Sequence, residues 1–210
     1  MGATPLRERI RDALLDDLVE GRLDAEDRIG VAPLAERFDV SLTPAREALT
    51  QLEAEGWVVL RPNRGFFAAP MTIEEAEYIY PVVGALEELA IELQPEVSPE
   101  RRAELRRLNE ELRAAADEPD RAFELDRLWH ETLTEGCGNP ILLKHLRSLR
   151  KRAERYDRAY MRHSGRIPIS TEDHDRIIEA LESAPDEVGR LVRENWMLSL
   201  HFVREWRSEP

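Results

Sequence analysis

Cysteine is nearly absent from this sequence, which contains a single one, Cys137. One thiol excludes an internal disulfide and is typical of a protein kept in a reducing compartment. Long apolar runs are also missing, and none approaches the roughly 18 residues needed to cross a bilayer. Residues 1–18 carry arginine and aspartate throughout and lack the apolar core of a signal peptide. We therefore expect a cytoplasmic protein with no membrane-spanning segment.

Basic residues are outnumbered, since 30 Lys and Arg stand against 43 Asp and Glu for a net charge of −13. An acidic chain is repelled by nucleic acid unless a local basic face exists. Both parts of the chain share the excess, with a net charge of −4 in residues 1–70 and −9 in residues 71–210. Any contact with DNA must then come from a small surface, for which the candidates are Arg46, Arg61 and Arg64.

Apolar residues make up 42% of the 210 residues, which is enough for two small domains with cores of their own. In the first of these, apolar residues recur at intervals of three and four between Leu6 and Leu18, the stripe of an amphipathic helix that Gly21 ends. A second, short helix is predicted over residues 32–38. Two helices therefore precede residue 40.

A third helix follows and is the most informative element of the chain. Ser41 or Thr43 can cap it, and Pro44 is tolerated because it falls in the first turn. Its apolar positions form one face, made of Ala45, Ala48, Leu49 and Leu52. The opposite face should point outward and consists of Thr43, Arg46, Glu47 and Thr50.

Two short strands should follow at residues 57–60 and 66–68, because both segments are rich in β-branched and aromatic residues and a Pro-Asn-Arg-Gly turn joins them. Helix, tight turn, second helix and two-stranded wing are the parts that set one helix in a DNA major groove. A small helical subdomain with solvated arginines is the alternative. The order of the parts within residues 31–68 favours a winged helix-turn-helix DNA-binding domain.

Residues 5–68 resemble the winged-helix domain of the GntR family of bacterial transcription regulators. The matching residues are Val40, Ser41, Thr43, Pro44, Arg46, Glu47, Ala48, Leu49, Leu52, Gly56, Trp57, Arg64 and Gly65. The resemblance implies a palindromic DNA operator contacted by Ser41, Thr43, Pro44 and Arg46, with Asn63, Arg64 and Gly65 entering the minor groove. The chain departs from the family at Leu42, where a base-reading arginine is usual, and at Ala32, where some members carry another.

Helical patterning then continues to the C-terminus with no strand-like segment. Six helices are expected, at about residues 73–93, 98–115, 119–134, 140–161, 171–182 and 186–206, the first of them interrupted at Pro81 and Gly84. Short connections between such helices predict a bundle. The expected fold is therefore mainly α: a winged helix-turn-helix domain in residues 1–70 and an all-α bundle of six to seven helices in residues 71–210.

Four polar side chains fall at positions of this bundle where apolar ones are expected, namely Asp126, His130, His174 and Asn195. An unpaired buried carboxylate is costly, so these groups should compensate one another. Imidazole nitrogens and a carboxylate oxygen that converge from separate helices can bind a divalent metal. The alternative is an internal Asp126–His130 ion pair, with His174 and Asn195 satisfied locally.

Residues 75–205 resemble the FCD effector domain of the FadR-like branch of the same family. The matching segments are residues 125–133, 138–142 and 173–181. The resemblance implies a divalent metal, Zn or else Ni or another transition metal, bound by Asp126, His130 and His174. The family's fourth ligand, a histidine, is replaced in this chain. Its position corresponds to Asn195 if the loop before Asp186 is one residue shorter than in the family, and to Trp196 if it is not. Asn195 is the better candidate because it lies on the apolar stripe of its helix.

The resemblance also implies a small-molecule effector beside the metal, with an organic acid as one candidate class. Many FCD domains carry an arginine four residues before the glutamate of their first helix, and in this chain Val83 occupies that position, ahead of Glu87. Arg147, Arg150 or Arg155 can take its place, although charged residues on a long helix are often only solvated. His145 is either a pocket residue or a core histidine.

The sequence is compatible with three functions. The first is a ligand-responsive transcription regulator, a homodimer that presents two recognition helices to a palindromic operator and is released by its effector. The second is a metal-dependent enzyme using Asp126, His130 and His174, which lacks a spare core-facing carboxylate as general base and leaves residues 31–68 without a role. The third is a dimeric scaffold without DNA contact, favoured by the acidic charge.

Overall fold

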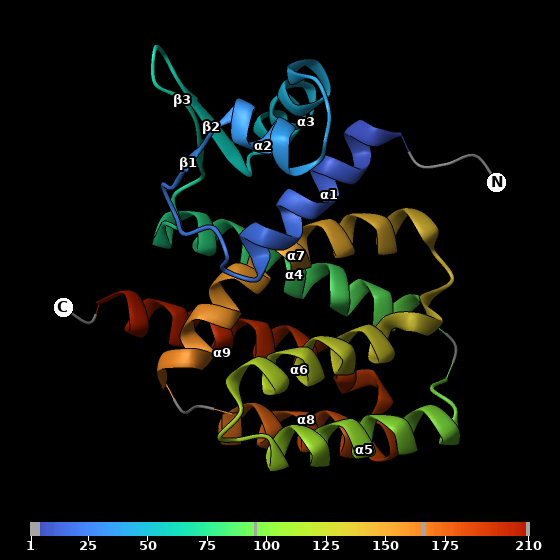
Figure 1. Ribbon diagram of the computed structural model, residues 1–210. Coiled ribbons are helices and arrows are strands. Elements are labelled where there is room, and N and C mark those ends of the chain that lie inside the picture. Colours follow the sequence, from blue (N-terminus) through green and yellow to red (C-terminus); the bar gives the residue numbers. More distant parts are fainter. Residues whose placement is uncertain (1–4, 95, 165–166, 209–210) are drawn as a thin grey trace. The chain divides into compact units, whose positions relative to one another are not determined.

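A computed structural model describes residues 5–94, 96–164 and 167–208 of the chain (Figure 1). The chain divides into two compact units, the first ending at Met71 and the second beginning at Thr72. None of the described helices is both long and apolar enough to cross a membrane.

The first unit combines three helices with a small antiparallel sheet. Its elements are α1 (Leu6–Val19), β1 (Arg28–Ile29), α2 (Val31–Arg37), α3 (Leu42–Ala54), β2 (Val58–Arg61) and β3 (Gly65–Ala68). The strand order is β1-β3-β2, and both outer strands run antiparallel to β3. The predicted winged helix-turn-helix order is confirmed. Strand β1 was not predicted, because two residues are too short to show a period.

The core of this unit is formed by the apolar residues that the helical spacing predicted to be buried. Ile10, Leu14 and Leu18 of α1 are buried against the inner face of α3, where Ala45, Ala48, Leu49 and Leu52 are all fully buried. Burying a leucine side chain stabilises the fold by about 1.5–3 kcal/mol. The face of α3 opposite to this core is thereby directed to solvent.

The second unit is a helical bundle. Its elements are α4 (Ile73–Leu93), α5 (Pro99–Ala114), α6 (Pro119–Thr134), the 3₁₀ helix η1 (Glu135–Cys137), α7 (Pro140–Ser164), α8 (Ile167–Ser183), the 3₁₀ helix η2 (Pro185–Glu187) and α9 (Val188–Ser208). The six predicted helices are confirmed. Two details differ, since α4 runs unbroken through Pro81 and Gly84, and α8 begins at Ile167 instead of Thr171.

Gly84 has a packing role in place of a helix break. Helix α4 lies along α9, and a Cβ on Gly84 would stand 3.3 Å from the Cβ of Trp196. The absence of that Cβ lets the two helices approach closely. Helix α6 packs against α5 and α7, and α8 against α5 and α9. Side chains of α4, α6, α7, α8 and α9 can therefore meet in the interior of the bundle.

Candidate functional site

The first candidate site is the solvent-facing side of α3. Leu42, Thr43, Arg46, Glu47 and Thr50 are all exposed, as the sequence predicts. They line a shallow groove of about 830 Å³ whose full lining is Arg7, Leu42, Thr43, Arg46, Glu47, Thr50, Gln51 and Ala54. Within the described part of the chain, no carboxylate forms an ion pair with Arg46. An uncompensated guanidinium thus stands on the outer face of the second helix of a helix-turn-helix.

The start of α3 differs in one respect from the prediction. Ser41 occupies the N-cap position, but its side chain makes no capping hydrogen bond, and neither does that of Thr43, which lies inside the helix. Pro44 falls in the first turn, where its missing N–H costs nothing. The exposed Ser41 hydroxyl is therefore not used for capping and is available to a ligand.

The turn between β2 and β3 requires unusual backbone angles. Asn63 and Gly65 have positive φ values of 60° and 94°, a region that asparagine and glycine tolerate best. The Arg61 guanidinium pairs with Glu26 at 2.6 Å and lies over the Phe67 ring, and that of Arg64 lies 5.5 Å from the same ring centre. Arg61 is therefore paired with an exposed carboxylate in the free protein, and its part in a local basic face stays a prediction. Arg64 has no such ion pair among the described residues.

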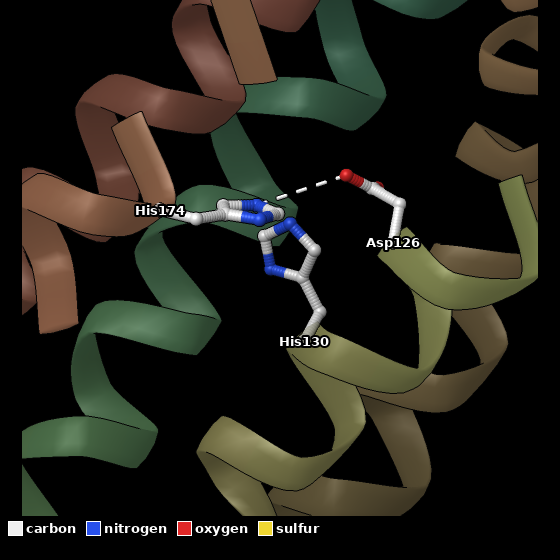
Figure 2. Close-up of side chains that lie close together, drawn as sticks. All are labelled: Asp126, His130 and His174. Carbon is white, nitrogen blue, oxygen red and sulfur yellow. Dashed lines mark ion pairs between the residues drawn. The ribbon is translucent and has the colours of Figure 1, made fainter. Parts of the chain in front are cut away.

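The second candidate site brings Asp126 and His130 of α6 together with His174 of α8 (Figure 2). One ligand atom from each residue can be chosen so that all lie within 4.8 Å of one another. His174 Nε2 and Asp126 Oδ1 are 3.7 Å apart, and the His130 ring meets the His174 ring nearly edge-on. The fold thus brings the three predicted residues close enough together that they could hold a metal ion.

His174 provides the test of whether a metal fits. Its side chain is fully buried, and the indole of Trp129 stacks on it with ring centres 3.6 Å apart. Its Nδ1 contacts Asn109 Oδ1 at 3.2 Å, whereas its Nε2 is buried without any hydrogen-bond partner. Burial and the nearby His130 both lower the pKa of His174, so the ring is neutral and carries a lone pair. A buried lone pair that faces a carboxylate and a second imidazole suits a transition metal.

Glu87 of α4 completes the surroundings of His130, and sequence reasoning did not assign it a site role. Its Oε2 accepts a hydrogen bond from His130 Nδ1 at 2.9 Å, and its Oε1 accepts one from Arg150 Nε at 2.7 Å. Burial alone would raise the pKa of Glu87, but the charges of Arg150 and His130 outweigh it and lower the pKa to about 2. With Nδ1 so engaged, His130 is left with Nε2 for the site.

A small cavity of about 20 Å³ adjoins these side chains. It is lined by Phe123, Asp126, Arg127, His130, Arg150, Glu154, Asp157 and Trp196. That volume suits one water molecule or ion, so an organic effector would need the cavity to open. Arg150 lines it, with its guanidinium held by Glu87, and the role of Arg150 in effector binding stays a prediction.

Other predicted residues lie elsewhere. His145 is exposed on α7, so its assignment to the pocket or the core is wrong. Asn195 is buried but is not among the cavity-lining residues, whereas Trp196 is, and its ring centre lies 5.0 Å from that of His130. Asn195 as a ligand stays a prediction. The expectation that the bundle has no further core-facing carboxylate is also wrong, because Glu87 and Asp157 are both buried.

The buried Asp157 makes stability depend on pH. Burial raises its pKa from 3.8 to about 8, against the opposing effect of the Tyr80 hydroxyl, which donates to Oδ1 at 2.5 Å. A carboxyl with a raised pKa in the folded state contributes stability at low pH that is lost as the pH rises through about 8. Relative to Asp157→Asn, the metal-free protein should lose up to about 1.4 kcal/mol of unfolding free energy per pH unit between about pH 5 and 8.

Urea unfolding at several pH values measures this difference. The exposed Asp117 provides a control, since Asp117→Asn should leave the wild-type pH profile unchanged. Parallel profiles for wild type and Asp157→Asn would contradict the expectation.

Comparison with known proteins adds two family matches to this geometry. Residues 6–68 match the family described as bacterial regulatory proteins, gntR family, and residues 78–195 match the FCD domain. The first match contains the exposed face of α3 and the wing. The second contains Glu87 and the Asp126, His130 and His174 cluster.

Two relatives match this chain over most of their length. The chain is 28% identical over 200 residues to the HTH-type transcriptional regulator BphR of Paraburkholderia xenovorans (strain LB400), covering 90% of this chain and 82% of BphR. It is 25% identical over 207 residues to the HTH-type transcriptional repressor GlaR of Escherichia coli (strain K12), covering 91% and 93%. The solved structure of E. coli McbR/YncC has the same fold, with a TM-score of 0.76 at 20% identity over 98% of this chain and 100% of that one.

Proposed function

Because the chain belongs to the GntR family of bacterial regulatory proteins and carries an FCD domain, we propose that this transcription regulator is a cytoplasmic, ligand-responsive repressor that binds a palindromic operator as a homodimer. The family and its relatives are regulators of transcription and not enzymes. A relative named as a repressor, GlaR, supports the direction of regulation. The observation that carries the DNA-binding part is the exposed face of α3 with its uncompensated Arg46.

The exposed face of α3 carries side chains that can form hydrogen bonds to base edges in a DNA major groove. An arginine guanidinium can bond the O6 and N7 atoms of guanine, and serine and threonine hydroxyls can contact phosphates or bases. In a dimer, two such helices would contact half-sites about 34–36 Å apart. Ser41, Thr43, Pro44 and Arg46 form the proposed major-groove contact, and Asn63, Arg64 and Gly65 the proposed minor-groove contact.

Fluorescence anisotropy with the promoter next to the protein's own gene tests this function. We expect saturable binding that is tighter than to random DNA of equal length and that weakens steeply as salt rises, because phosphate contacts release counterions. No binding to either DNA would favour the dimeric scaffold without DNA contact, and equal affinity for promoter and random DNA would contradict a specific operator at this promoter.

An apolar stripe on α4 supports the homodimer. Tyr78, Val82, Leu89 and Leu93 are spaced along one side of the helix and are 67%, 47%, 39% and 49% exposed. Contiguous exposed apolar surface on a helix usually marks an interface. We infer that a second copy of the chain covers this stripe, because a palindromic operator has two equivalent half-sites and each needs its own DNA-binding domain.

Charging this stripe should separate the subunits. We expect Val82→Glu/Leu89→Glu to sediment as a monomer where the wild type sediments as a dimer, because the paired stripes would each bury new carboxylates. Leu128 is similarly exposed on α6 but off the stripe, so Leu128→Glu is the control that should stay dimeric. A dimer that survives the double substitution would place the interface elsewhere.

We propose further that Asp126, His130 and His174 hold a divalent transition metal, Zn or Ni, with Asn195 as the predicted fourth ligand. Two imidazoles and one carboxylate match the ligand preference of these ions, and the unpartnered Nε2 of His174 supports the assignment. A bound ion would supply positive charge to attract the carboxylate of an organic-acid effector. Arg150 borders the same cavity and would help to orient such a ligand.

Metal content after dialysis, with isothermal titration of the metal-free protein, tests this site. We expect about one ion per chain in the wild type, strongly reduced in His174→Ala, since a missing imidazole removes a ligand. The exposed His145 offers a matched control, and His145→Ala should bind metal like the wild type. A wild-type protein that binds no transition metal would overturn the proposal.

A further inference from the structure

The side chain that holds His174 in place comes from a third helix. Asn109 of α5 is buried and its Oδ1 lies 3.2 Å from His174 Nδ1. His174 is the one residue of the Asp126, His130 and His174 cluster that α8 supplies. Asn109 lies outside this cluster and contacts Nδ1 of the His174 ring, whereas Nε2 of the same ring lies toward Asp126.

The contacts of Asn109 determine which way its amide points. Its Nδ2 donates to the Thr171 carbonyl oxygen at 2.9 Å and to Asp175 Oδ1 at 2.7 Å. Both partners can only accept, so the nitrogen must lie on that side and Oδ1 must face His174. Because Oδ1 can only accept, His174 Nδ1 carries the ring hydrogen.

We propose that Asn109 is a positioning residue that fixes the His174 tautomer and thereby presents Nε2 to the metal. This inference rests on the proposed metal site. A neutral imidazole carries one hydrogen, so a hydrogen on Nδ1 leaves Nε2 as the bare donor atom. Nε2 is the atom of His174 that is buried without a partner.

Asp175 in turn holds Asn109. Its Oδ2 accepts from Arg113 at 2.6 Å, and Asp175 is exposed at the outer edge of α8. A chain of contacts thus runs from the surface pair Arg113–Asp175 through Asn109 to His174. His130 is oriented in the same manner by Glu87, but with a charged acceptor instead of a neutral amide. Removing the amide should therefore weaken metal binding without removing any ligand.

The test compares metal affinity and ring tautomer in the wild type and in variants of Asn109 and its partners. Zinc dissociation constants are measured by competition with a chromophoric chelator, and the His174 tautomer is measured in the metal-free protein from its ring ¹⁵N shifts. We expect Asn109→Leu to bind zinc about 10- to 100-fold more weakly, as partners of metal-bound histidines do when replaced. We also expect it to lose the Nδ1–H tautomer.

An exchanged pair separates positioning from packing. Asn109→Asp/Asp175→Asn keeps an acceptor facing Nδ1 and a hydrogen bond between the two positions, but it turns a carboxylate oxygen toward the Thr171 carbonyl. It should therefore restore the Nδ1–H tautomer and part of the zinc affinity. Arg113→Ala removes only the exposed outer pair and should change affinity little. If Asn109→Leu does not fold, Asp175→Ala removes one of the two acceptors that fix the amide and leaves the Thr171 carbonyl. This variant should lower the share of the Nδ1–H tautomer and give an intermediate affinity.

The outcomes are distinct. Wild-type affinity and tautomer in Asn109→Leu would overturn the positioning role while leaving the metal site intact. Weak binding in the exchanged pair, with the tautomer lost, would mean that Asn109 only packs α5 against α8. If the wild type binds no zinc, the proposed metal site fails, and an unchanged tautomer in metal-free Asn109→Leu would overturn the positioning role as well.

Discussion

Replacing Arg46 with alanine should nearly abolish binding to the operator. Each bidentate arginine–guanine contact is worth about 1–3 kcal/mol, and a dimer would lose two of them, or about 2–6 kcal/mol in total. The side chain is exposed on α3 and has no ion-pair partner in the described part of the chain, so its loss should not disturb the fold. Fluorescence anisotropy against the promoter fragment gives the change in dissociation constant.

The control for this variant must remove the same charge elsewhere. Arg107 is exposed on α5 and pairs with Glu104 and Glu111, so Arg107→Ala changes the net charge equally without touching the reading face. It should bind the operator like the wild type. Arg46→Ala should also lower the slope of log affinity against log salt if the guanidinium contacts a phosphate. Unchanged affinity in Arg46→Ala would mean that another face reads DNA.

Glu87→Gln should be the most destabilising conservative substitution in the bundle. Glu87 is completely buried between Arg150 and His130, and neutralising it leaves the Arg150 guanidinium, itself only 5% exposed, without a counter-charge. Breaking a buried ion pair by removing one partner costs about 3–5 kcal/mol. Urea unfolding of the metal-free proteins measures the loss, and Glu87→Gln/Arg150→Met should recover part of it.

The effect should also depend on pH in a defined direction. Burial opposes ionisation of Glu87, but Arg150 and His130 lower its pKa from 4.5 to about 2. A carboxyl with a lowered pKa contributes stability above about pH 4.5 that is lost as the pH falls toward 2. The difference between wild type and Glu87→Gln should therefore shrink in acid. It should also become smaller as the pH rises through the pKa of His130, which Glu87 raises against the effect of burial, because the charged His130–Glu87 pair is then lost. Glu92→Gln, at an exposed position of the same helix, should show neither effect.

Periodicity in the sequence was sufficient for most of the fold. The spacing of Ile10, Leu14 and Leu18 correctly predicted which side of α1 is buried. The apolar positions of α3 on the side opposite Arg46 did the same for that helix. Such patterns are readable because a helix repeats every 3.6 residues and one side must be apolar to be buried. The break expected at Gly84 was wrong, because that glycine serves the close approach of Trp196 on α9, a neighbour the local sequence does not reveal.

Within the site, the sequence by itself determined that Asp126, His130 and His174 face the bundle interior, because each lies on an apolar stripe. Only the tertiary structure decided their partners: Glu87 lies 43 residues from His130, and Asn109 lies 65 residues from His174. It also decided that Trp196, and not Asn195, borders the cavity, since adjacent helical residues differ in direction by about 100° and only packing sets the rotation of α9. Periodicity specifies a face; the partner across it depends on how helices distant in sequence pack together.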